Sequence, residues 1–243
     1  MNSRVTAQAE SAYVSDEGQL QGEIASPEIC PIDSKDLPKV DFRRGFYLTY
    51  VKPTVDRGAA AVGLLVLAIP MLCIALLVSL TMGSPVLFRQ KRIGRDGREF
   101  DVLKFRTMNA DRRCASQGVS EEQRLTHKCE TDPRHTRVGR WLRRYSLDEL
   151  PQLLNVLRGD MSLIGPRPEL VSVVERHYCE NLHQRHKVKP GLTGLWQVSA
   201  RGNGPMHENG GWDIVYLQEI SALTDLKILL RTPMVMFGSQ AGK

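Results

Sequence analysis

The sequence predicts a mainly α-helical, monotopic membrane protein with a small β-hairpin and a proline-broken, re-entrant hydrophobic helix. Residues 58–88 carry no charged side chain, and this run exceeds the roughly 20 residues that a helix needs to cross a hydrocarbon core. Pro70 stands near the middle of the run. Two strand-like runs follow, separated by residues 94–97, in which Asp96-Gly97 favours a tight turn. We expect no large parallel sheet.

The chain of 243 residues is long enough for one substantial core. Residues 1–41 carry three basic and eight acidic side chains and show no apolar period, so we expect a disordered acidic tail. Residues 42–88 should form the membrane-associated region, and residues 89–243 a cytoplasmic domain with interfacial helices. Residues 42–243 carry thirty basic against nineteen acidic side chains. This excess suits phosphorylated substrates, an anionic membrane surface or nucleic acid.

The five cysteines are odd in number, widely spaced and without a CxxC pair, which indicates reduced thiols in a cytosolic setting. Cys114, His127, Cys129 and His135 are conceivable metal ligands. Their spacing matches no familiar zinc pattern, and the residues between them are typical of a solvated loop. We therefore expect no metal at these positions.

The hydrophobic run has basic residues on both sides. Under the positive-inside rule, both of its ends then lie in the cytoplasm. Pro70 removes a helical hydrogen bond and clashes with the preceding turn, so a helix that enters, bends and leaves on the same side is expected. A kinked spanning helix and a buried helix of a soluble protein are the alternatives. The flanking basic residues are Arg43, Arg44, Lys52 and Arg57 before the run, and Arg89, Lys91, Arg92 and Arg95 after it.

The remaining chain is predicted to be mainly helical. Residues 109–130 are polar and indicate a loop with some helix. Residues 212–237 alternate apolar clusters with charged side chains, as expected of helices that lie against a core or a membrane surface.

Residues 131–170 contain the densest cluster of potential chemistry. Ser146 and Glu149 fit a capping box at a helix start. Asp148 stands beside Glu149, shortly after Arg143 and Arg144, where the helix N-terminus and the arginines would bind anions and lower the pKa of Asp148. An ionised Asp148 suits attack on phosphorus, while Glu149, about 100° away around the helix, suits binding of Mg²⁺. Capping and surface salt bridges are the alternative.

Further basic residues are expected near these acids. In residues 165–168, Gly-Pro-Arg-Pro, the prolines confine the backbone and present Arg167 rigidly, which suits phosphate binding. Lys104 and Arg106 leave the second predicted strand on one face and could bind the same phosphates or lipid headgroups. A turn before Arg201 leads into a polar and aromatic segment.

Three ordered blocks, residues 91–108, 132–170 and 189–202, together resemble the monotopic phosphoglycosyl transferases of bacterial polysaccharide initiation. The resemblance covers roughly residues 45 to 235. It implies a transferase with a UDP-sugar donor, a polyprenyl phosphate acceptor, Mg²⁺ and contact with membrane lipid, on the cytoplasmic face of the bacterial inner membrane. Residues 89–243 would then be the catalytic domain.

Carried over by position, the family's Asp-Glu dyad falls on Asp148, as the nucleophile that takes the sugar phosphate, and Glu149, as the residue that serves the metal. The implied reaction is ping-pong: UMP leaves, and polyprenyl phosphate then attacks the phosphosugar-aspartate. The basic residues expected to bind phosphate or substrate are Arg143, Arg167, Lys104, Arg106 and Arg201.

Two departures from the family pattern stand out. Ile69 precedes Pro70, where many relatives place a serine whose hydroxyl could satisfy a freed carbonyl at the bend. Residues 199–203 and 207–211 differ from a more compact Gly-Arg-Asn, so contacts to the donor sugar should differ there. The absence of a large multi-spanning N-terminal region is typical of the small form of the family.

Three other functions compete with the transferase. A non-catalytic basic membrane adaptor would need no Asp148. A nucleic-acid-binding protein lacks a recognisable module here and leaves the apolar run unexplained, so we expect no nucleic-acid partner. A diphosphate hydrolase would use the same carboxylate with water as acceptor. The sequence leaves open the sugar, with UDP-galactose or UDP-glucose expected, the polysaccharide pathway, and whether the chain forms a homodimer.

Overall fold

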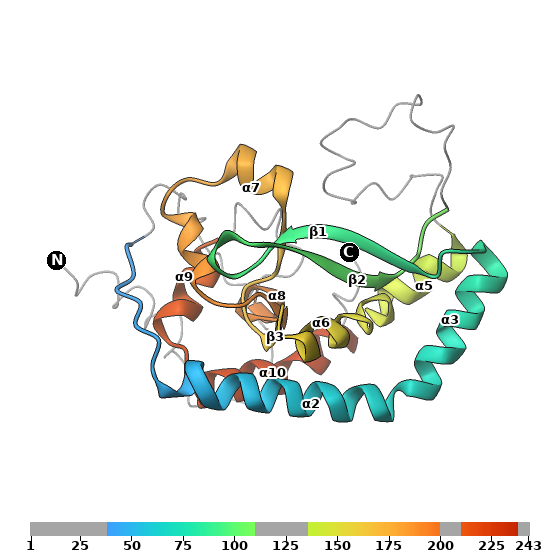
Figure 1. Ribbon diagram of the computed structural model, residues 1–243, viewed down its shortest axis with the longest axis horizontal. Helices are drawn as coiled ribbons and strands as arrows, with labels where there is room; N and C mark the ends of the chain where they lie inside the picture. Colours follow the sequence, from blue (N-terminus) through green and yellow to red (C-terminus); the bar gives the residue numbers. More distant parts are fainter. Residues whose placement is uncertain (1–37, 110–135, 200–209, 238–243) are drawn as a thin grey trace, which may run out of the picture. The chain divides into compact units, whose positions relative to one another are not determined.

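The computed structural model describes residues 38–109, 136–199 and 210–237 (Figure 1). The predicted tail up to residue 37, most of the polar loop, the conceivable metal ligands from Cys114 to His135, and Arg201 lie outside the described residues. Of the five cysteines, Cys73 and Cys179 are described, and neither forms a disulfide.

The described chain is mainly helical, as predicted. The α-helices are α2 (Lys52–Val66), α3 (Ala68–Met82), α5 (Arg137–Arg144), α6 (Gln152–Arg158), α7 (Val171–His177), α8 (Leu195–Ser199), α9 (Gly211–Gln218) and α10 (Ala222–Phe237). Shorter helical turns are η1 (Tyr47–Val51), η2 (Arg95–Gly97), η4 (Leu147–Glu149) and η5 (Leu182–Lys187). The strands are β1 (Leu87–Ile93), β2 (Glu99–Phe105), β3 (Ser162–Ile164), β4 (Glu169–Leu170) and β5 (Gly191–Thr193).

The predicted hairpin is confirmed. Strands β1 and β2 pair antiparallel from Leu87 opposite Phe105 to Ile93 opposite Glu99. Asp96 adopts the left-handed conformation with φ 57° in the connecting turn, and Gly97 follows at φ 76°, which suits the Asp-Gly pair because both residue types tolerate positive φ. The sequence did not predict β4, which adds a short third strand beside β1, or the parallel pair of β3 and β5.

The hydrophobic run forms two helices rather than one. Helices α2 and α3 meet at Leu67, whose φ of −91° and ψ of 4° leave the helical region. The proline at position 70 has no N–H to bond the carbonyl of Val66, and the ladder resumes when the Met71 N–H donates to the Leu67 carbonyl over 2.8 Å. The predicted break therefore falls one turn before Pro70.

Among the described residues, no single helix is both long and apolar enough to cross a membrane. The pair Tyr47–Val66 and Ala68–Met82, bent by 63°, meets that requirement together, by length and composition alone.

The inner faces of the bent pair pack against the rest of the fold. Ala60 on α2 joins Val102 and Val156 in one core cluster, and Val78 on α3 joins Leu142 in another. The first turns of α2 and α10 are joined by the ion pair of Lys52 with Asp225, and in the view of Figure 1 α2 lies beneath the hairpin.

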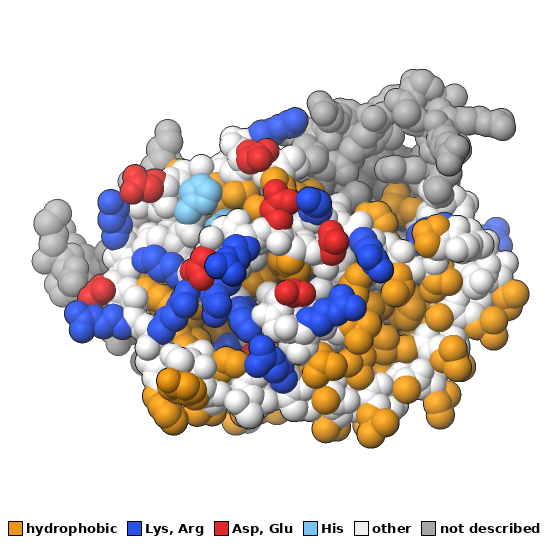
Figure 2. Space-filling model, in the orientation of Figure 1, with side chains coloured by type: hydrophobic (Ala, Val, Ile, Leu, Met, Phe, Trp, Pro, Cys, Tyr) orange, Lys and Arg blue, Asp and Glu red, His pale blue; other side chains and the backbone are white. Residues whose placement is uncertain are grey.

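The outer faces of α2, α3 and α10 carry exposed apolar side chains, many of them in the orange area of Figure 2. They include Val55, Val62, Leu65, Val66, Ile69, Leu72, Leu76, Leu80, Leu223, Leu226, Leu230 and Met234. An apolar surface of this extent marks an interaction site on a folded protein, and burial of each Val or Leu would contribute about 1.5–3 kcal/mol.

Candidate active site

Asp148 and Glu149 lie on η4, a single helical turn between α5 and α6. Ser146 takes the left-handed conformation, with φ 54°, and so redirects the chain after α5. The predicted capping box is wrong, because the Ser146 side chain makes no capping hydrogen bond and the Glu149 carboxylate points to cations from other elements. Helix α6 begins only at Gln152, after Pro151.

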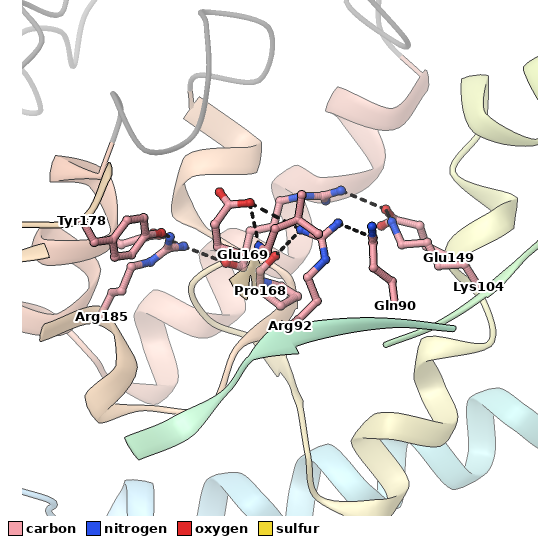
Figure 3. A network of polar contacts seen from close by, with 11 residues as sticks. Gln90, Arg92, Lys104, Glu149, Pro168, Glu169, Tyr178 and Arg185 are labelled. Atoms are coloured by element: carbon pink, nitrogen blue, oxygen red, sulfur yellow. Dashed lines mark hydrogen bonds and ion pairs between the residues drawn. The ribbon is translucent and has the colours of Figure 1, made fainter. Parts of the chain in front are cut away.

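The Glu149 carboxylate is the meeting point of two cations. Lys104 Nζ on β2 donates to Glu149 Oε1 over 2.8 Å, and Arg167 Nη2 donates to the same oxygen over 3.1 Å; Figure 3 shows Lys104 and Glu149 facing each other. Burial alone would raise the pKa of Glu149, but the two cations lower it well below its usual range. Lys104 and Arg167, which are 45 and 18 positions from Glu149 in the sequence, thus both bind this predicted acid.

Asp148 is 8% exposed and makes no ion pair with a described residue. Burial, and then the neighbouring charge of Glu149, raise the pKa of Asp148 to about 6. The prediction that a helix start and arginines lower this pKa is wrong, because burial of the carboxylate outweighs the charges of Lys104 and Arg167, which act to lower the pKa. The carboxylate remains mostly ionised above pH 7.

The structure does not bring every predicted basic residue to the dyad. The Arg106 guanidinium donates to backbone carbonyls after α3, those of Met82, Gly83 and, over 3.1 Å, Ser84. Strand β2 ends at Phe105, so the alternation that would place Arg106 beside Lys104 ends there. Arg143 lies in the last turn of α5, which packs against η4.

The backbone that presents Arg167 is fixed by hydrogen bonds to β5. The Gly165 N–H donates to the Thr193 carbonyl over 2.9 Å, and the Gly191 N–H donates to the Pro166 carbonyl over 2.8 Å. A side chain at Gly165 would lie 2.6 Å from the Lys189 carbonyl oxygen. This close approach accounts for the glycine in the Gly-Pro-Arg-Pro segment.

Two arginines that the sequence analysis did not assign to the site bind the backbone of residues 167–168; Figure 3 shows both, Arg92 beside Pro168 and Glu169, and Arg185 beside Tyr178. Arg185 Nη2 donates to the Arg167 carbonyl over 2.7 Å and pairs with Asp213 over 2.6 Å. Arg92 Nη1 donates to the Pro168 carbonyl over 3.2 Å and contacts Glu169 at 3.4 Å.

No local pattern distinguishes these supporting residues from solvated surface residues. Arg185 lies in the polar run Leu-His-Gln-Arg-His-Lys, yet its side chain is 1% exposed. Its burial follows from tertiary packing alone.

Within the described residues, no three His, Cys, Asp or Glu side chains gather closely enough to hold a metal by themselves. Mg²⁺ at phosphate sites usually binds one or two carboxylates and completes its shell with water and substrate phosphates. Among the described residues, Glu149 Oε2 accepts no hydrogen bond and Asp148 forms no ion pair, although the charges of Lys104 and Arg167 act on Asp148 in part. The dyad therefore fits a magnesium ion that arrives with a phosphorylated substrate.

A buried carboxylate beside a second carboxylate that binds a lysine and an arginine is an arrangement that suits chemistry on phosphate groups. Comparison with known proteins then gives the family. The family model described as bacterial sugar transferase matches residues 47–239, and the chain belongs to this family.

Similar proteins carry specific names. The chain is 40% identical over 198 residues to the UDP-glucose:undecaprenyl-phosphate glucose-1-phosphate transferase of Escherichia coli. This alignment covers 79% of this chain and 41% of that protein. It is 40% identical over 196 residues to the galactosyl transferase CpsE of Streptococcus agalactiae, covering 78% of this chain and 43% of that protein. The exopolysaccharide production protein ExoY of Sinorhizobium fredii is 40% identical over 188 residues, covering 74% and 83%. The chain thus spans about two fifths of the first two relatives.

Proposed function

We propose that this protein transfers a hexose 1-phosphate from a UDP-sugar to polyprenyl phosphate, releases UMP, and so begins exopolysaccharide or related glycan synthesis. The observation that carries this proposal is the convergence of Lys104 and Arg167 on Glu149, next to the buried Asp148. Relatives named for undecaprenyl-phosphate sugar transfer support the choice of substrates.

In the first step, an ionised Asp148 oxygen attacks the sugar-linked phosphorus of the UDP-sugar. The bond from this phosphorus to the bridging oxygen breaks, and UMP leaves with that oxygen. The product is a phosphosugar ester of the Asp148 carboxylate. The bond between the sugar's anomeric carbon and its oxygen stays intact throughout.

In the second step, an oxygen of polyprenyl phosphate attacks the same phosphorus. The Asp148 carboxylate leaves in its original form, and the product is a polyprenyl diphosphate sugar. Arg167 and Lys104 stabilise the charge on the phosphate oxygens in both steps. Before substrate binds, their ion pairs with Glu149 hold them in position, so little rearrangement is needed at the moment of reaction.

Magnesium would bind at Glu149 together with diphosphate oxygens of the donor. When bound, magnesium would neutralise part of the negative charge on the leaving UMP. Arg143 and Arg201 remain proposed substrate contacts, and Arg106 is proposed to fix the chain after α3 through its carbonyl contacts.

The bent pair α2 and α3 is proposed to enter and leave the cytoplasmic face of the bacterial inner membrane. Its exposed apolar face, with that of α10, would rest among the lipid chains. Phe105 on β2 packs in the same cluster as Val78 on α3, so the dyad turn lies close to the helix that enters the bilayer. That position would let a lipid-borne phosphate reach Asp148.

The test is UMP release by full-length protein purified in detergent, supplied with Mg²⁺, undecaprenyl phosphate and each of a panel of UDP-sugars. We expect UMP from one donor and none from Asp148→Asn. Asp160→Asn is the matched control, because Asp160 is an exposed aspartate after α6 that makes no ion pair with a described residue. If no donor yields UMP from folded protein with lipid present, the proposal is wrong and the adaptor hypothesis replaces it.

A further inference from the structure

A second group of cations surrounds a cavity away from the dyad, between α2, the hairpin turn η2 and the segment after η5. Figure 2 shows Lys and Arg side chains gathered on this face, above the first half of α2. The basic residues that line the cavity are Arg44, Lys52, Arg57, Arg95, Lys187 and Lys189, against one acidic residue, Asp56.

Several of these cations already have partners. Lys52 pairs with Asp225 at 2.5 Å, and Arg44 pairs with Asp96 at 2.9 Å. Lys187 Nζ donates to a backbone carbonyl over 3.0 Å. Arg57 and Lys189 differ from these, because neither makes a hydrogen bond or ion pair with a described residue.

The side chains of Arg57 and Lys189 nevertheless both lie next to Gly159. A side-chain carbon built at Gly159 would lie 2.6 Å from Arg57 Nη2 and 3.4 Å from Lys189 Nζ, so the two nitrogens are at most 6.0 Å apart. Burial, and then the charges of Arg57 and Arg95, lower the pKa of Lys189. The charges of Asp56 and Asp160 act in the opposite direction and offset this effect only in part. An external anion that accepts hydrogen bonds from both cations would therefore be stabilised.

A phosphate group fits this separation. Charge-assisted hydrogen bonds from nitrogen to a phosphate oxygen span about 2.7–2.9 Å, so one phosphate can accept from both nitrogens. We propose that Arg57 and Lys189 form a second phosphate-binding site, which takes the phosphate of a lipid headgroup or a free phosphate ester. This inference does not depend on the transferase reaction.

The site is separate from the dyad. Arg95 and Lys104 lie at opposite ends of a hairpin with seven-residue strands, which corresponds to about 20 Å. Helix α2, which carries Arg57, also exposes Val55 and Val62 at 60% and 62%. A lipid headgroup can therefore reach the cavity while its chains contact the apolar face of the same helix.

The experiment is calorimetric titration of the full chain in detergent with two probes: short-chain phosphatidic acid and inorganic phosphate, at constant ionic strength and without Mg²⁺. We expect saturable binding that Arg57→Gln and Lys189→Gln each weaken about tenfold. Arg98→Gln is the matched control, since Arg98 is an exposed cation next to the hairpin turn that does not line the cavity. Binding of phosphatidic acid alone identifies a lipid headgroup; equal binding of both probes identifies the phosphate as sufficient.

Because the dyad cations also bind phosphate, Arg167→Gln distinguishes the two sites. Binding that survives Arg57→Gln/Lys189→Gln but disappears in Arg167→Gln would overturn the inference, as would an equal loss in Arg98→Gln. A second measurement needs no ligand: relief of repulsion predicts that Lys189→Gln leaves the thermal midpoint unchanged or raises it, and a lowered midpoint shows that the lysine serves the fold. UMP release, measured in parallel, reports on the proposed function alone.

Discussion

The protein has two cation clusters that differ in how their charge is balanced. At the dyad, Lys104 and Arg167 share one oxygen of Glu149. In the cavity beside α2, Arg57 and Lys189 come within 6.0 Å of each other with no ion pair among the described residues. Glu149 forms ion pairs with both cations of the first cluster, whereas Asp56 and Asp160 act on Lys189 without forming an ion pair with it, and we propose that an external anion completes the second cluster. Removal of the Glu149 charge should therefore destabilise the protein, whereas removal of the Lys189 charge should not.

The largest effect is expected where the charge pair is most deeply buried. Asp213→Asn leaves Arg185, whose side chain is 1% exposed, without its anion, and loss of one partner of a buried pair costs about 3–5 kcal/mol. Since Arg185 also holds the Arg167 carbonyl, UMP release should fall as well. Urea unfolding measures the stability change. A loss no larger than that of the exposed Glu175→Gln would show that the pair does not hold this region.

Glu149→Gln should have the next largest effect. It removes the shared anion from Lys104 and Arg167, but these side chains are 18% and 33% exposed, so solvent reduces the loss to about 2 kcal/mol. The depressed pKa of Glu149 means that its stabilising contribution is present above the unfolded pKa and is lost as the pH falls. The free energies of unfolding of wild type and variant, measured by chemical denaturation, should therefore become equal at acid pH. A difference between them that stays constant at all pH values would contradict the ion-pair assignment.

Asp148→Asn should abolish UMP release and yet raise stability. The folded pKa of about 6 lies above the ordinary value of 3.8, so the folded state favours the protonated acid and wild type loses stability as the pH rises through about 4 to 6. The variant lacks this loss and should be more stable than wild type by on the order of 3 kcal/mol at pH 8. Chemical unfolding at pH 4 and pH 8 tests the sign. A destabilised variant at pH 8 would mean that Asp148 is paired in the folded protein.

The same pKa predicts the pH dependence of the reaction. Attack requires the ionised carboxylate, so kcat/KM for the UDP-sugar should rise through about pH 6 and level off above it. A profile that is flat from pH 5 to pH 8 would exclude Asp148 as the group that titrates.

Local sequence patterns predicted the helical class, the hairpin at Asp96-Gly97 and the helix break near Pro70, because these depend on residues close together in the chain. They also identified Lys104, Arg167 and Glu149. The convergence of these three is a tertiary event between β2, η4 and the loop after β3. The pKa of Asp148 could not be predicted, since its largest cause is the burial of the carboxylate, which arises only in the folded chain.

The residues that support the Arg167 loop could not be predicted from the sequence. Arg92, Arg185 and Asp213 resemble solvated surface residues in sequence and become buried only in the folded chain. The same holds for the cavity cations. Arg57 and Lys189 are 132 positions apart in the sequence, and the fold places both of their side-chain nitrogens next to Gly159.

The central claim is that Asp148 becomes covalently attached to the sugar phosphate. Its most direct test is the intact mass of the protein after brief incubation with UDP-sugar and Mg²⁺ in the absence of polyprenyl phosphate, followed by peptide mapping. We expect one added hexose phosphate on the peptide that contains Asp148, one equivalent of UMP, and loss of the adduct when polyprenyl phosphate is added. Continuous UMP release with no adduct would contradict it and indicate a hydrolase instead.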